Sequence, residues 1–227
     1  MIISIANVLA TDELDAIRSK LDQENFQENF IDGKATAGWH ARLVKYNTQL
    51  RSDAPALPEL RNMVQQALKR NALFQMAALP KTISPILFSR YEVGMEYGSH
   101  VDNAFMGEEN RMRSDLSLTL FLSQPETYVG GELIIESTQG EQAFKLDAGA
   151  MVLYPSSTLH RVEPVTQGVR LAAVTWIQSL VRERSDREIL FDLETARQAI
   201  FAKYGKTTEF DLLSKSYANL LRKWGEV

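Results

Sequence analysis

From about residue 82 to residue 179, the sequence is a series of short β-rich runs separated by turn residues. The runs cover residues 83–91, 116–122, 132–135, 143–146, 150–154, 161–165 and 169–177. Turn-forming pairs such as Gly130-Gly131 and Gln167-Gly168 stand between them. Seven or eight short strands at this spacing are typical of two packed antiparallel sheets. This segment therefore predicts a jelly roll, also called a double-stranded β-helix.

Helical patterns flank the β-rich segment on both sides. Before it, apolar residues at helical spacing follow Thr11, a helix-capping residue, and Pro58, a favoured first-turn residue. After it come two amphipathic stretches, the second opening on Thr208 and Asp211, which resemble a capping box. The predicted fold class is α+β and mainly β, with N-terminal helices packed on the jelly roll and a C-terminal helical extension. The expected divisions are residues 1–80, 81–179 and 180–227.

The absence of cysteine limits the metal chemistry open to this chain of 227 residues. Disulfides, iron–sulfur clusters and thiolate zinc sites all need cysteine, so a metal site here has to use imidazole and carboxylate groups. A net charge of −4 without a basic stripe argues against a nucleic-acid partner. No apolar run has the length of a membrane span, and residues 1–10 lack the basic start of a secretory signal. A cytoplasmic protein is expected.

Two of the three histidines stand where a mononuclear metal site needs them. His100 and Asp102 form an H-x-D pair, and His160 comes at the start of a later β-rich run. Residues i and i+2 of an extended segment point the same way, so both side chains of the pair can reach one ion. Two imidazoles and one carboxylate form the facial triad of non-haem Fe(II) oxygenases. The remaining histidine, His40, is expected to have no metal role.

Arg170 adds an independent indication. Its run, residues 169–176, is apolar at odd and even positions alike, so both faces of the strand are expected to be buried. A buried guanidinium needs an anion, and the ordinary partner is an internal Asp or Glu. If Gln167-Gly168 is the turn of a hairpin, Arg170 lies about four residues, or roughly 13 Å, along from His160. A short dicarboxylate with one end on a metal would fill that gap.

These segments together resemble the bacterial PKHD-type hydroxylases, which are Fe(II)/2-oxoglutarate-dependent dioxygenases related to prolyl 4-hydroxylases and associated with iron uptake. The resemblance runs nearly from end to end. Besides the residues already named, it rests on Ala37-Gly38-Trp39, Leu43-Val44-Lys45, Arg90-Tyr91, Gly94, Arg113-Ser114-Asp115-Leu116-Ser117, Thr119-Leu120-Phe121-Leu122-Ser123, Gly130-Gly131-Glu132-Leu133, Tyr154-Pro155-Ser156, Val162, Pro164-Val165 and Trp176-Ile177-Gln178-Ser179.

The resemblance implies a role for each candidate site residue. The implied metal ligands, which form the catalytic centre, are His100, Asp102 and His160. Arg170 would hold the distal carboxylate of 2-oxoglutarate, and Tyr91 is expected near the same cosubstrate. Phe121 stands where some prolyl hydroxylases have a second cosubstrate tyrosine, which leaves a remaining contact to a neighbour such as Thr119. L-Ascorbate is implied as a cofactor that reduces the iron.

The implied activity is a hydroxylation that consumes O₂ and 2-oxoglutarate and releases succinate and CO₂. Kinship with prolyl hydroxylases indicates a peptidyl or prolyl substrate, whereas the association with iron uptake indicates a siderophore-like one. One alternative is a non-catalytic iron- and 2-oxoglutarate-binding sensor of the same fold. Another is a cupin-like protein that uses a different divalent metal, although such a site has no use for a buried Arg170.

Two further segments have two interpretations each. Residues 103–113 are expected to form either a lid over the open side of the metal or a solvated connector. The apolar side of the last helix is expected to pack internally, with self-association into a homo-oligomer as the alternative. That apolar side contains Leu213, Tyr217, Leu220, Leu221 and Trp224.

Overall fold

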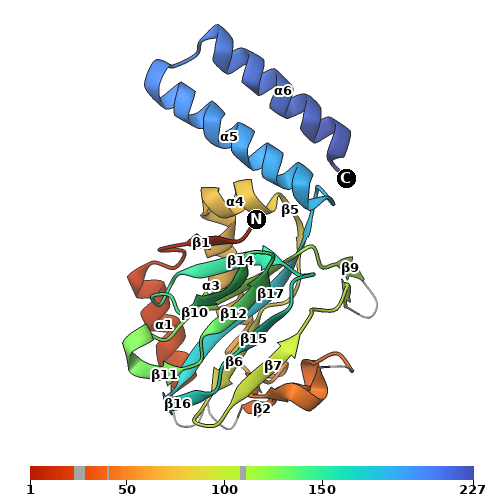
Figure 1. Cartoon of the computed structure of the whole chain (residues 1–227). Coiled ribbons are helices and arrows are strands. Elements are labelled where there is room, and N and C mark those ends of the chain that lie inside the picture. Colours follow the sequence, from red (N-terminus) through yellow and green to blue (C-terminus); the bar gives the residue numbers. More distant parts are fainter. Residues whose placement is uncertain (23–28, 40, 108–110) are drawn as a thin grey trace.

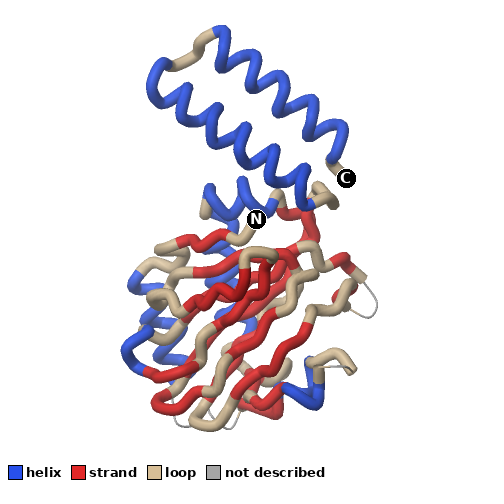
Figure 2. Tube along the Cα trace, in the orientation of Figure 1, coloured by secondary structure: helices blue, strands red, loops and turns tan. Residues whose placement is uncertain are grey.

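Two antiparallel β-sheets packed face to face form the body of the computed structural model, which describes residues 1–22, 29–39, 41–107 and 111–227 (Figures 1 and 2). In spatial order, the larger sheet contains β1 (Ile3–Ile5), β14 (Met151–Pro155), β10 (Leu116–Phe121), β17 (Arg170–Ser179), β6 (Leu87–Tyr91), β4 (Thr48–Leu50) and β2 (Phe30–Asp32), and β5 (Pro80–Ile83) also pairs with β17. The smaller sheet contains β13 (Gly140–Phe144), β12 (Leu133–Ser137), β15 (His160–Val162), β7 (Glu96–His100) and β3 (Lys45–Tyr46). The predicted jelly roll is confirmed.

Two short ribbons and three 3₁₀ turns complete the β-rich part. The ribbons pair β11 (Tyr128–Gly130) with β16 (Val165–Gly168), and β8 (Phe105–Met106) with β9 (Met112–Arg113). The turns are η1 (Gly33–Thr36), η2 (Arg42–Val44) and η3 (Pro125–Thr127). Residues 103–113 thus contain two short strands, and residues 108–110 of that segment lie outside the described residues.

The alternation of side chains along β10 shows how the larger sheet divides the molecule. Leu116 and Leu120 belong to the apolar core between this sheet and the N-terminal helices. Ser117 and Thr119 have the opposite parity and line a cavity between the two sheets. One face of the larger sheet therefore supplies the main core, and the other face supplies the floor of the cavity.

The N-terminal helices cover the outer face of the larger sheet, as predicted (Figure 1). They are α1 (Thr11–Asp22), α3 (Leu57–Arg70) and α4 (Ala72–Ala78). Leu60 and Val64 lie one turn apart on α3, and together with Ile17 of α1 they are completely buried in the core that this sheet shares with the helices. Each buried aliphatic side chain of this kind contributes roughly 1.5–3 kcal/mol to stability.

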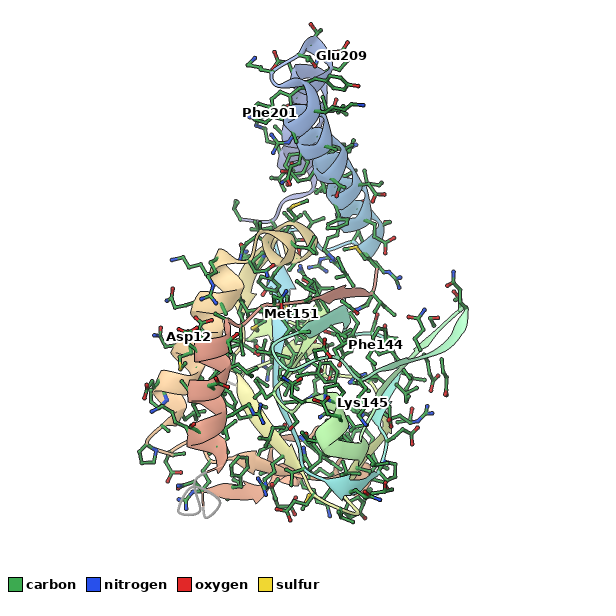
Figure 3. The ribbon with its side chains drawn as sticks, turned by 90° about the vertical axis from the view of Figure 1, so that its left-hand side faces the viewer. Asp12, Phe144, Lys145, Met151, Phe201 and Glu209 are labelled. Atoms are coloured by element: carbon green, nitrogen blue, oxygen red, sulfur yellow. The ribbon has the colours of Figure 1, made fainter. Side chains whose placement is uncertain are left out.

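The C-terminal helices form a hairpin that stands away from the sandwich (Figures 1 and 3). In α5 (Arg184–Tyr204), Leu190 is buried in a small cluster with Leu79 and Val181. In α6 (Thr208–Trp224), no residue is fully buried, and the apolar stripe that includes Tyr217 is only partly covered by α5 and this cluster. None of the helices in the described part of the chain combines the length and apolar character that a membrane crossing requires.

Three sequence-based details were wrong. The first is the cap of α6, which is Thr207: its side chain accepts a hydrogen bond from the Phe210 amide, whereas the Asp211 carboxylate pairs with Lys206. The second is the strand expected over residues 83–91, which is divided into β5 and β6. The third is the strand expected over residues 161–165, which is divided into β15 and β16.

The expected hairpin about Gln167-Gly168 is also absent from the described structure. β15 pairs with β12 and β7 in the smaller sheet, while β17 pairs with β10, β6 and β5 in the larger one. His160 and Arg170 therefore lie on facing sheets and not along one ladder. Gly168 has φ +72° and ends β16, where a Cβ would collide with the carbonyl oxygen of Thr127. Its role is a close approach of two backbones and not a tight hairpin turn.

Candidate active site

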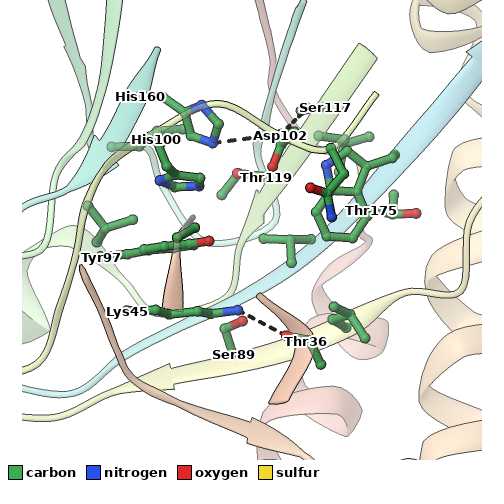
Figure 4. A pocket seen from close by; sticks show the side chains of 18 of the residues that line it. Thr36, Lys45, Ser89, Tyr97, His100, Asp102, Ser117, Thr119, His160 and Thr175 are labelled. Atoms are coloured by element: carbon green, nitrogen blue, oxygen red, sulfur yellow. Dashed lines mark hydrogen bonds and ion pairs between the residues drawn. The ribbon is translucent and has the colours of Figure 1, made fainter. Parts of the chain in front are cut away.

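A cavity of about 120 Å³ opens between the two sheets (Figure 4). All six residues singled out from the sequence line it, three as metal ligands and three as cosubstrate contacts: His100, Asp102, His160, Arg170, Tyr91 and Thr119. The larger sheet contributes side chains from β6, β10, β14 and β17, and the smaller sheet contributes side chains from β3, β7, β12 and β15. His40, the remaining histidine, lies outside the described residues.

The two histidines and the aspartate converge at one end of this cavity. His100 ends β7, His160 begins β15, and the two are register partners across the β7–β15 pair. Asp102 follows two residues after His100, so its side chain reaches the same place. One ligand atom from each of the three side chains lies within 4.8 Å of the other two. This spacing fits a single ion bound by two imidazole nitrogens and one carboxylate oxygen.

Backbone carbonyls hold both imidazoles in the orientation that a metal needs. His100 Nδ1 lies 2.8 Å from the Gly98 carbonyl oxygen, and His160 Nδ1 lies 2.9 Å from the Thr158 carbonyl oxygen. A carbonyl oxygen only accepts hydrogen bonds, so each Nδ1 carries the proton. Each Nε2 then presents its lone pair to the cavity, which is the usual arrangement behind a metal-binding histidine.

The carboxylate of Asp102 is also fixed from behind. The Ser117 hydroxyl donates to Asp102 Oδ2 at 2.5 Å and lies 2.8 Å from the Ser156 hydroxyl. Asp102 Oδ2 is 3.7 Å from His160 Nε2. Ser117 belongs to β10 of the larger sheet, so this hydrogen bond ties the ligand segment after β7 to the opposite sheet.

Burial keeps His100 neutral at physiological pH. Desolvation, reinforced by the neighbouring His160, lowers the pKa of His100 to about 4. The neutral ring is the form that donates a lone pair to a metal. Aromatic contacts restrict the rings further, since Tyr97 stacks on His100 with centroids 3.6 Å apart and Tyr154 packs edge-on against His160 at 5.0 Å.

Arg170 is the most deeply buried cation of the cavity, with 1% of its surface exposed. Its Nε and Nη2 atoms have no hydrogen-bond partner, and no carboxylate among the described residues forms an ion pair with it. The rings of Tyr91 and Phe121 lie 5.0 and 5.5 Å from the guanidinium carbon. The internal Asp or Glu that would be its ordinary partner is therefore absent from the described structure, and the cavity is where an anion would reach it.

Tyr91 and Thr119 line the same cavity floor as Arg170. Tyr91 is the register partner of Arg170 across β6 and β17, and burial raises the pKa of its phenol. Thr119 is buried on β10, where its hydroxyl is hydrogen-bonded to Tyr154. Phe121 stands where some prolyl hydroxylases have a second cosubstrate tyrosine. Its ring packs against the guanidinium of Arg170.

Sequence reasoning did not assign roles to three further residues that shape the site. Tyr97 stacks on one metal-ligand candidate, and Ser117 binds another. Lys45 lines the cavity from the edge strand β3. A signal existed for Ser117, because a polar residue on a strand that is expected to be buried needs a buried hydrogen-bond partner. No such signal existed for Lys45, since β3 is only two residues long.

Comparisons with known proteins agree with this geometry. A family model described as the 2OG-Fe(II) oxygenase superfamily matches residues 86–178, and one described as the PKHD-type hydroxylase C-terminal domain matches residues 185–226. The chain is 57% identical to a PKHD-type hydroxylase of Rippkaea orientalis and 59% identical to one of Gloeothece citriformis, over the full length of both chains in each case. The chain belongs to the PKHD-type hydroxylase family.

Membership in this family makes the chain an Fe(II)- and 2-oxoglutarate-dependent hydroxylase with O₂ as cosubstrate and a small molecule or a peptide as substrate. Solved structures show the same fold at low sequence identity. A prolyl-4-hydroxylase of Pseudomonas putida has a TM-score of 0.54 and 19% identity, with 78% of this chain and 92% of that chain covered. A prolyl hydroxylase of Trichoplax adhaerens has a TM-score of 0.58 and 15% identity, with 81% and 86% covered.

Proposed function

We propose that His100, Asp102 and His160 hold the ferrous ion of this hydroxylase, and that Arg170 holds the distal carboxylate of 2-oxoglutarate. One observation carries the proposal: three metal-binding groups within 4.8 Å share a cavity with a buried guanidinium that lacks an anion. Two imidazoles and one carboxylate suit ferrous iron and leave coordination positions open. The unpaired arginine would give a dianionic cosubstrate a charged partner beside that site.

When bound, ferrous iron and 2-oxoglutarate supply the oxidising power that converts a C–H bond of the substrate to a C–OH group, with O₂ consumed and succinate and CO₂ released. The chain's own contribution is geometry. The Gly98 and Thr158 carbonyls fix the two imidazole rings, and Ser117 orients the carboxylate of Asp102. Such supporting hydrogen bonds set both the orientation and the basicity of metal ligands.

The floor of the cavity binds the cosubstrate and keeps water away from it. Arg170 would donate two parallel N–H hydrogen bonds to one carboxylate, a geometry that its planar guanidinium favours. Tyr91 and Thr119, which line the same floor, would donate their hydroxyl protons to the cosubstrate oxygens. Burial of all three side chains strengthens these charge-assisted contacts, because little water competes for them.

The test is to measure metal and cosubstrate binding separately. Replacing a ligand, as in Asp102→Ala, should abolish tight Fe(II) binding measured anaerobically by competition with a chromogenic chelator. Arg170→Met should leave Fe(II) binding intact and weaken 2-oxoglutarate at least 100-fold, as measured by calorimetry on the zinc-loaded protein. Equal loss of metal and cosubstrate in Arg170→Met would make the arginine a structural residue and refute its assignment.

Other expectations from the sequence belong to the same proposal. We infer that the substrate is a peptidyl, prolyl or siderophore-like compound, in keeping with the fold shared with prolyl hydroxylases. We also infer ascorbate as the reductant, from the family resemblance, and a cytoplasmic location. The division of the chain into residues 1–80, 81–179 and 180–227 stays a prediction from the sequence. Sedimentation tests self-association through the partly covered face of α6. Hydrogen exchange with and without substrate tests whether residues 103–113 close over the cavity as a lid.

A further inference from the structure

A second buried cation, Lys45, lines the cavity and is not used by the chemistry described so far. It lies on β3, the edge strand of the smaller sheet, and only 4% of its surface is exposed. Its amine stands over the ring of Tyr97, 5.0 Å from the centroid, and Tyr97 in turn stacks on His100. Figure 4 shows Lys45, Tyr97 and His100 following one another along one wall of the cavity.

The hydrogen bonds of Lys45 leave most of its amine without a partner. An ammonium group has three N–H donors, and the described residues offer one acceptor, the Thr36 hydroxyl, at 2.9 Å. Gln49 fixes that hydroxyl: its amide nitrogen donates to Ser89, and its amide oxygen accepts from Thr36. The Thr36 oxygen is therefore free to accept from Lys45. The amine is thus held in place by a polar chain that carries no negative charge.

No carboxylate among the described residues forms an ion pair with Lys45. Burial lowers the pKa of Lys45 to about 8. The carboxylates of Asp102 and Asp32 attract the amine only at longer range, and this attraction raises the pKa by less than burial lowers it. A lysine in this state is still mainly cationic at neutral pH. A buried cation without a counter-charge is costly, so an anion from outside the chain is the expected partner.

Lys45 and Arg170 occupy different parts of the cavity. Arg170 starts β17 of the larger sheet and lies among buried residues such as Tyr91 and Phe121. Lys45 instead contacts Thr36, which is exposed at the end of η1. The arginine therefore lies among buried residues of the floor, whereas the lysine contacts a residue of the cavity lining that is exposed to solvent.

We propose that Lys45 recognises an oxyanion group, a carboxylate in its simplest form, on the substrate that is hydroxylated. This inference rests on the proposed function, because both carboxylates of 2-oxoglutarate are already engaged there, one at the metal and the other at Arg170. The remaining cation then has to be matched by the other reactant. The target is thus an acid whose anionic group lies at Lys45, beside Tyr97, while the C–H bond that reacts lies at the metal.

The test uses trifluoroacetate, a small fluorinated carboxylate, as a probe, with trifluoroacetamide as its neutral counterpart. Each is added to protein saturated with zinc and 2-oxoglutarate, and binding is followed by ¹⁹F NMR line broadening. Trifluoroacetate should bind, and trifluoroacetamide should bind at least tenfold more weakly. Lys45→Met should raise the dissociation constant of trifluoroacetate at least tenfold, and Lys45→Arg should restore most of the affinity. Lys203→Met, which removes an exposed lysine that lies over Tyr204, serves as the matched control and should have no effect.

Each alternative result overturns the inference in a recognisable way. Absence of trifluoroacetate binding, equal binding of the amide, or unchanged binding in Lys45→Met would each exclude a role for Lys45 in anion recognition. Weakened zinc binding in Lys45→Met would show that the lysine only positions Tyr97 and His100. A parallel loss of 2-oxoglutarate would make it a cosubstrate residue. If wild-type protein binds neither zinc nor 2-oxoglutarate, the proposed function fails first, and that failure is visible before the probe is added.

Discussion

His100 and His160 face each other across adjacent strands, with ring centroids 4.2 Å apart and each Nδ1 hydrogen-bonded to a backbone carbonyl. The carbonyls belong to Gly98 and Thr158, each two residues before its histidine. The backbone of β7 and of the turn before β15 therefore fixes the orientation of the two imidazole rings. A metal ion that binds here meets rings that are already aimed at it, so little conformational entropy is lost on binding.

Removal of the Ser117 hydroxyl should weaken the metal site without unfolding the protein. In Ser117→Ala the carboxylate of Asp102 loses the hydrogen bond that orients it. Loss of such a supporting contact typically lowers metal affinity by about 10–100-fold. The measurement is anaerobic Fe(II) competition with a chelator. Ser156→Ala is the matched control because Ser156 contacts Ser117 but is not bonded to Asp102, and an equal effect of both substitutions would contradict the assignment.

Arg170→Met should separate stability from cosubstrate binding. The guanidinium is buried without a counter-charge, so the ligand-free protein should lose no more than about 1 kcal/mol of unfolding free energy, or should gain stability. Binding of 2-oxoglutarate should stabilise the wild type by several kcal/mol at saturating concentration and stabilise the variant hardly at all. Urea denaturation with and without cosubstrate measures both quantities. A loss of about 3 kcal/mol or more in the ligand-free variant would point to a hidden internal partner for the arginine.

Lys45 should make the ligand-free protein more stable as the pH rises from 8 to 10.5. Desolvation lowers its pKa from 10.5 to about 8 in the folded state, with Asp102 and Asp32 opposing the shift. Between pH 8 and pH 10.5 the unfolded chain binds more protons than the folded one, so the free energy of unfolding rises with pH over this interval. The contribution of Lys45 to that free energy is therefore highest above pH 10.5 and lowest, and constant, below pH 8. The full difference is on the order of 3 kcal/mol.

The measurement for Lys45 is the difference between wild type and Lys45→Met in unfolding free energy at pH 8 and at pH 9.5. Tyrosines with raised pKa values act with the opposite sign at higher pH, but they are common to both proteins and cancel in the difference. Wild type should gain stability relative to the variant over this interval. A flat difference would mean that the lysine is solvated and has an ordinary pKa.

Leu190→Ala should loosen the C-terminal hairpin more than the sandwich. Leu190 is buried in the cluster that joins α5 to Leu79 and Val181, and its truncation should cost about 2–5 kcal/mol at that junction. Hydrogen exchange should become faster in α5 and α6 while the amides of β10 and β14 keep their protection. Equal acceleration in all four elements would show that the hairpin and the sandwich unfold as one unit.

The sequence predicted the architecture because its signals were local. Alternating apolar residues mark β10, a continuous apolar run marks β14, and helical spacing marks α1 and α3, so the main layers followed directly. The ligand triad was equally accessible, because His100 and Asp102 lie two residues apart on an extended segment. Strands of two or three residues, such as β3, carry too little pattern to be recognised, and with β3 the cavity role of Lys45 was missed.

The relation between His160 and Arg170 could not be predicted in the same way. A glycine with positive φ serves equally well in a hairpin turn and at a close backbone approach, so Gly168 by itself does not decide which strand pairs with which. Pairing is settled by contacts distant in the chain. One of them is the β11–β16 ribbon, in which Tyr128 pairs with Gly168 and which separates β15 from β17 along the chain.

The most direct test of the central assignment is anaerobic visible spectroscopy of protein mixed with Fe(II) and 2-oxoglutarate. We predict a weak metal-to-ligand charge-transfer band in the wild type, followed by formation of succinate when air is admitted. The band should be missing in Asp102→Ala and should require far more 2-oxoglutarate in Arg170→Met. A wild-type protein with no band and no succinate, or an Asp102→Ala variant that retains both, would contradict the account.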